Sequence, residues 1–61
     1  MIVIPCYLLN GPKGRWYAFL PNSDGTMYVQ RWENADCVRE DRQSRSTARR
    51  LWRWLVRLGY R

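Results

Sequence analysis

The residues most suited to chemistry in this 61-residue chain are the arginines of its last fifteen positions. If Thr47 to Arg61 forms an α-helix, one side is apolar, comprising Ala48, Leu51, Trp52, Leu55 and Leu58. The opposite side carries Arg49, Arg50, Arg53 and Arg57, and the two borders carry Trp54 and Val56. Guanidinium groups pair with phosphates, carboxylates and guanine edges through two hydrogen bonds at once. The pattern therefore predicts an amphipathic helix whose outer side binds an anionic partner.

The distribution of charge along the chain supports the same interpretation. The formal net charge is +6, but residues 1–41 carry −1 and residues 42–61 carry +7, with no acidic residue after position 41. Such asymmetry is typical of segments that bind nucleic acid or an acidic protein surface. A solvated basic surface without a partner is the alternative. The predicted binding residues combine arginines with aromatic residues that can stack on bases: Arg31, Arg42, Arg45, Arg49, Arg50, Arg53, Arg57, Trp16, Tyr28, Trp32 and Trp54.

Other kinds of chemistry lack the residues they require. The chain has no histidine, which excludes Ser-His and Cys-His nucleophilic pairs. Two cysteines without histidine cannot complete a structural zinc site. The acidic residues Asp36, Glu40 and Asp41 could hold a hard cation, although the first turn of a helix also favours acids. We expect a protein that is not an enzyme and has no cofactor or metal.

Three strands must precede the helix. The apolar segment Ile2–Leu9 predicts a strand buried on both faces, or nearly so. Pro5 restricts this strand to an edge of the sheet unless the proline sits on a bulge. The segments Arg15–Leu20 and Thr26–Trp32 predict a hairpin around the turn at residues 21–25. A symmetric turn would set Leu20 opposite Thr26. One face would then carry Tyr17, Phe19, Met27 and Val29, and the other Trp16, Ala18, Leu20, Tyr28, Gln30 and Trp32.

The segment from Glu33 to Thr47 is harder to interpret. Asn34 or Asp36 could cap a helix, which predicts a short helix or loop at about 35–42, followed by the main helix. The main helix would begin at a Ser44 or Ser46 cap, and Gly59 fits the residue just past its end. A single helix over residues 35–58 is the alternative.

Together these elements predict one α+β domain over residues 1–61. A three-stranded antiparallel β-meander would be followed by an amphipathic C-terminal helix packed on the sheet. Whether Cys6 and Cys37 pair is left open. The apolar start lacks a basic segment and contains Pro5, so we expect no secretory signal and a cytoplasmic location with reduced thiols. Residues 49–58 alone resemble a membrane-active Arg/Trp-rich peptide, but their apolar side has a sheet to pack on, so we expect no membrane contact.

The predicted element order resembles that of small sheet-based DNA-binding domains such as integrase arm-binding and plant AP2 domains. It is a resemblance of element order alone, and it implies DNA binding without assigning a role to any residue here. In size and composition the chain is also similar to small phage and mobile-element inhibitors of host proteins, including CRISPR complexes. A nucleic-acid-binding protein is therefore the first hypothesis. The second is an inhibitor that docks its Arg/Trp surface on an acidic or nucleic-acid-binding site of a host protein, in the host cytoplasm if phage-encoded.

Overall fold

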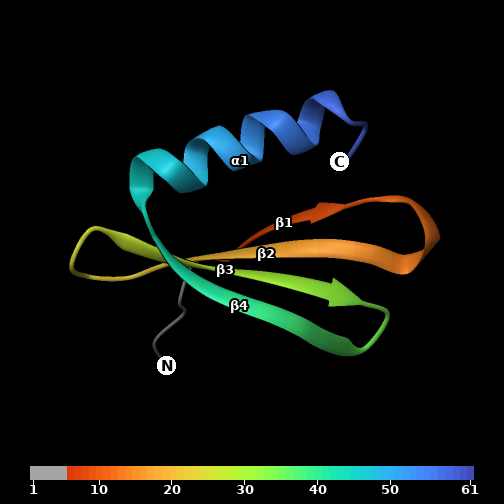
Figure 1. Ribbon diagram of the computed structural model, residues 1–61, viewed down its shortest axis with the longest axis horizontal. Coiled ribbons are helices and arrows are strands. Elements are labelled where there is room, and N and C mark those ends of the chain that lie inside the picture. Colours follow the sequence, from red (N-terminus) through yellow and green to blue (C-terminus); the bar gives the residue numbers. More distant parts are fainter. Residues whose placement is uncertain (1–5) are drawn as a thin grey trace.

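The computed structural model describes residues 6–61, which form an antiparallel sheet of four strands with one helix lying across it (Figure 1). The elements in chain order are β1 (Tyr7–Asn10), η1 (Pro12–Gly14), β2 (Arg15–Pro21), β3 (Thr26–Glu33), β4 (Asp36–Ser44) and α1 (Arg45–Arg57). The strand order in the sheet is β1-β2-β3-β4, which is a meander. The predicted α+β class is confirmed, and the predicted number of three strands is wrong because residues 6–61 alone contain four. The resemblance to three-stranded DNA-binding domains fails for the same reason.

The β2–β3 hairpin has the predicted faces and a different register. Leu20 lies opposite Tyr28, two residues beyond the predicted partner Thr26. The turn is tighter than predicted because Gly25 adopts φ +86° and the Asp24 carboxylate accepts a hydrogen bond from the Thr26 backbone N–H. A shift of two residues preserves which side chains share a face, since successive side chains alternate.

The fourth strand occupies the segment predicted to be a loop or helix. β4 pairs with β3 through a two-residue turn, where Asn34 adopts φ +55°. Asparagine tolerates this left-handed conformation, which the twist of a short hairpin requires. A β-bulge next to Arg31 and Trp32 leaves Val38 without a partner in the register. The predicted helix at 35–42 and the alternative single helix over 35–58 are therefore both wrong.

The core lies between α1 and one face of the sheet. Its buried residues are Leu9, Phe19, Val29, Ala48 and Leu55, with Tyr17, Met27, Leu51, Trp52 and Tyr60 packed around them. This confirms the predicted face of the hairpin. In β1, however, Tyr7 and Leu8 are exposed, so the expected burial of the first strand on both faces is wrong for its described part. Residues 2–5 of that predicted strand lie outside the described residues.

Helix α1 begins and ends at defined caps. The Ser44 hydroxyl accepts a hydrogen bond from the Thr47 backbone N–H at 3.3 Å, which confirms the first of the two predicted caps. Gly59, at φ +100°, follows the C-cap Leu58 and turns the chain back, as predicted. Leu58 was predicted on the apolar side, but at the C-cap it is 55% exposed.

The residues after α1 return to the sheet and pair with β1. Arg61 and Asn10 exchange two backbone hydrogen bonds, at 2.6 and 2.8 Å. Tyr60 packs edge-on against Tyr17 with ring centroids 5.5 Å apart. Its ring lies so close to Gly11 that a Cβ atom there would overlap it. A glycine is therefore required at position 11, so that the Tyr60 ring can pack against the backbone there.

Cys6 and Cys37 are both exposed free thiols, so they do not pair. Among residues 6–61, no helix has the length and apolar character needed to cross a membrane.

Candidate functional site

The arginines of α1 form two groups. Arg50, Arg53 and Arg57 are exposed on the side of the helix opposite the buried Leu55. Arg45 and Arg49 lie closer to the sheet and line a groove beside Trp52. Arg49 was predicted on the outer side, but at about 100° from Ala48 it lies on the border between the two sides. The outer stripe is therefore narrower than predicted, and part of the positive charge is directed toward the sheet.

All five acidic residues lie in the sheet or its turns, and three of them pair with arginines from the sheet. Arg31 pairs with Glu33 at 3.8 Å, Arg39 with Asp41 at 2.7 Å, and Arg42 with Asp24. Within residues 6–61, none of the arginines of α1 has a carboxylate within ion-pair distance: Arg45, Arg49, Arg50, Arg53 and Arg57. The positive charge of the helix is therefore not neutralised by its own fold.

Arg42 and Arg31 occupy different places from the helical arginines with which they were grouped. Arg42 lies on β4, where its guanidinium also donates a hydrogen bond to the Thr26 hydroxyl at 3.2 Å. Hydrogen bonds from Thr26, together with Arg42, hold the pKa of Asp24 below its ordinary value. Arg31 lines a recess of about 230 Å³ with Arg39, on the other flank of α1 near Leu51. Both belong to ion pairs of the sheet.

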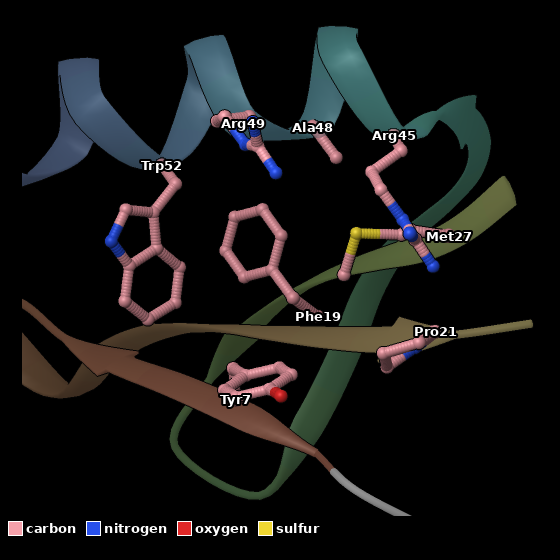
Figure 2. Close-up of a pocket in the computed structure, with 8 residues that line it drawn as sticks. All are labelled: Tyr7, Phe19, Pro21, Met27, Arg45, Ala48, Arg49 and Trp52. Carbon is pink, nitrogen blue, oxygen red and sulfur yellow. The ribbon is translucent and has the colours of Figure 1, made fainter. Parts of the chain in front are cut away.

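A groove runs between α1 and the sheet on the side of Arg45 and Arg49 (Figure 2). Its volume is about 440 Å³, within the usual range of about 300–1,000 Å³ for sites that bind small molecules. The lining residues are Tyr7, Phe19, Pro21, Met27, Arg45, Ala48, Arg49 and Trp52. Trp52 meets Phe19 at 5.1 Å and Tyr7 at 6.4 Å between ring centroids, both edge to face. The groove thus has aromatic walls and two cationic side chains.

The aromatic residues predicted to bind lie on the opposite face of the sheet. Trp16 and Trp32 stack on each other at 4.8 Å with an interplanar angle of 12°. Their indole N–H groups donate to the Asn34 carbonyl at 2.8 Å and to the Gln30 side chain at 3.0 Å. Tyr28 is 37% exposed on the same face. Because the sheet lies between them and α1, the structure does not unite the predicted aromatic residues with the helical arginines in one surface.

Among the aromatic residues predicted to bind, Trp54 differs from the other three because it lies on α1, where it is 56% exposed. The groove residues Tyr7, Phe19, Pro21, Met27 and Trp52 were absent from the predicted site. The sequence shows only that these residues are apolar. Apolar character predicts burial in the core and does not distinguish a core residue from one that lines a groove.

The acidic residues considered as cation ligands are on β4. Glu40 and Asp41 are successive strand residues and point to opposite faces. Gln30 donates to Glu40 at 2.5 Å, and Arg39 pairs with Asp41. In the part of the chain from Cys6 onward, no group of three or more potential ligands of this kind is assembled.

Comparison with known proteins gives no relative: no protein-family model, curated protein or solved structure matches this chain significantly. The charges and contacts described above therefore have to indicate the function.

Proposed function

We propose that this is a nucleic-acid-binding protein without enzymatic activity, which contacts phosphates through the arginines of α1. The observation that carries the proposal is the contrast in pairing. Three of the four arginines of the sheet have carboxylate partners, Arg15 being the exception, whereas within residues 6–61 the arginines of the helix have none. Exposed, unpaired guanidiniums along one helix match a polyanion whose charges repeat at regular intervals. The exposed free thiols of Cys6 and Cys37 suit a reducing compartment such as the cytoplasm.

The binding surface consists of three outer arginines and two groove arginines. The outer three span residues 50–57 on the exposed side of the helix, a length of about 10 Å at 1.5 Å per residue. Each phosphate that an arginine neutralises releases condensed counterions, so affinity must fall steeply as salt rises.

The test uses two double variants that remove the same charge from different regions. Arg50→Gln with Arg53→Gln removes two unpaired arginines, and Arg31→Gln with Arg39→Gln removes two paired ones. Binding to a fluorescent 20-nucleotide single strand would be measured by anisotropy between 50 and 200 mM salt. We expect the helix variant to lower the slope of log K against log salt by about 1.4, since each phosphate contact to a single strand contributes about 0.7. The sheet variant should retain a slope close to that of the parent.

Equal losses in the two variants would show that net charge attracts nucleic acid without a defined surface. No detectable binding by the parent protein at 50 mM salt and micromolar concentration would refute the proposal.

A second candidate function is binding to an acidic host protein, as an inhibitor. It is favoured by Trp54 and Leu58, which are exposed by 56% and 55% and lie four residues apart, on one side of the helix. Trp and Arg dominate the energetically important positions of protein interfaces. Trp54→Ala would weaken capture of a protein from nuclease-treated lysate under this function. Nucleic-acid binding through Arg50 and Arg53 would be largely unaffected.

A further inference from the structure

The groove between α1 and the sheet combines aromatic walls with arginines that are unpaired within the described residues. Aromatic rings form its walls, from Tyr7 on β1, Phe19 on β2 and Trp52 on α1. Two arginines without ion-pair partners in residues 6–61, Arg45 and Arg49, lie along its helical side, and Figure 2 shows Arg45 reaching down from the helix toward Met27. We propose that this groove receives one unstacked base of a single-stranded nucleic acid, while Arg45 and Arg49 bind the phosphates on either side of that base.

The proposal rests on the proposed function and specifies which form of nucleic acid is preferred. Inside a duplex, both faces of a base are covered by its neighbours, so only an unpaired or extruded base can enter a groove lined by rings. Tyr7 is 52% exposed and Trp52 is half-buried, so their rings, which meet edge to face, can contact a planar ligand above the buried Phe19. Stacking on such side chains is largely independent of base identity.

The spacing of the two arginines agrees with a nucleotide flanked by two phosphates. Arg45 and Arg49 are four residues apart on α1, so their Cα atoms are separated by about 6 Å along the axis. Flexible guanidinium side chains from these positions can reach two successive phosphates of an extended strand. In an acidic peptide, a carboxylate need not occur on both sides of an aromatic residue, whereas every internal nucleotide has a phosphate on each side.

The other aromatic surface is less suited to this role. On the open face, Trp16 and Trp32 already cover each other, and their N–H groups have partners within the protein. The same face carries Glu40, which is acidic, and Arg42, which is paired with Asp24. That face would repel or fail to attract the backbone of the same strand.

The experiment compares the full chain with two tyrosine variants and two oligonucleotides. Tyr7→Ala removes an exposed wall of the groove, and Tyr28→Ala removes an exposed tyrosine of the open face as a matched control. The probes are an oligothymidylate of five nucleotides and an abasic oligomer with the same number of phosphates. A second readout is the methyl signal of Met27, which lines the groove, in methionine-labelled protein; the signal is assigned with Met27→Leu.

We expect the parent protein to bind the oligothymidylate roughly tenfold more tightly than the abasic oligomer, and the Met27 signal to shift only with the former. Tyr7→Ala should remove most of the preference for the oligothymidylate and leave the affinity for the abasic oligomer unchanged. Tyr28→Ala should keep the preference. The Met27 signal of each unbound variant also reports whether the core has remained folded.

Four outcomes would overturn the inference. If both probes bind equally and Tyr7→Ala changes neither, phosphate binding stands and the groove receives no base. If Tyr28→Ala abolishes the preference instead, the open face is the stacking surface. If an acidic peptide with one aromatic residue shifts Met27 and the oligothymidylate does not, the groove receives a protein side chain. If neither oligomer binds while the 20-nucleotide strand does, the groove receives no base, whereas failure of all three to bind would refute the proposed function itself.

Discussion

The two faces of the sheet have comparable aromatic content and opposite arrangements. On the face covered by α1, the rings of Phe19 and Trp52 meet edge to face, and the groove beside them remains accessible. On the open face, Trp16 and Trp32 lie flat against each other with their polar groups satisfied. The comparison shows that the arrangement of aromatic residues, more than their number, separates a candidate binding surface from one that stabilises the fold.

The largest expected effect concerns the covered face. Leu55→Ala removes a side chain that is 1% exposed at the centre of the core, and should reduce the free energy of unfolding by about 2–5 kcal/mol. Leu58→Ala, at the exposed C-cap, is the matched control and should change it by less than about 0.5 kcal/mol. Urea denaturation followed by far-UV circular dichroism measures both. Similar losses in the two variants would mean that α1 does not pack on the sheet as described.

An intermediate effect should appear on the open face. If the stack of Trp16 and Trp32 is structural, a double-mutant cycle with Trp16→Leu and Trp32→Leu should give a coupling energy of about 0.5–1.5 kcal/mol. Oligonucleotide affinity should be unchanged in the same variants. A coupling near zero together with weakened binding would reverse the roles that we assign to the two faces.

The smallest effect concerns Asp24, in the β2–β3 turn. Because the folded state lowers the pKa of this carboxyl below that of the unfolded chain, its ionised form adds stability at neutral pH. This contribution is present above the unfolded pKa and is lost as the pH falls through the folded pKa. Asp24→Asn should therefore lower the melting temperature slightly at pH 7 and have less effect in strong acid. An equal change in melting temperature at both pH values would show that ionisation of Asp24 does not contribute to stability.

The sequence predicted the elements that have a clear apolar period. Helix α1 was located because Ala48, Leu51, Trp52 and Leu55 recur at helical spacing, and the hairpin faces were found because alternation survives a two-residue shift of register. β4 was missed because its residues 39–44 contain no apolar side chain on either face. Its pairing depends on the Asn34 turn and on polar contacts such as Gln30 with Glu40, which a local pattern does not reveal.

The candidate site was predicted in part. Exposed arginines on α1 follow from helical periodicity, and Arg50, Arg53 and Arg57 lie where that periodicity places them. The groove could not be predicted, because it depends on how far Tyr7 and Phe19 lie from α1 in three dimensions. Nor could the sequence show that Asp24 pairs with Arg42, since these residues are 18 positions apart and meet only across the unpredicted strand.

The backbone pairing of Asn10 with Arg61 has a consequence for the order of folding. Every neighbouring pair of strands is joined by a short turn, so the three hairpins can form from contacts that are local in sequence. The bond between Asn10 and Arg61 spans 51 positions, and it can form only when α1 has crossed the sheet. Closing so long a loop costs entropy before any contact is gained. Closure of β1 by the returning chain is therefore the late step, and the rate of folding should respond more to changes in the hairpins than to changes at Tyr60 or Gly11.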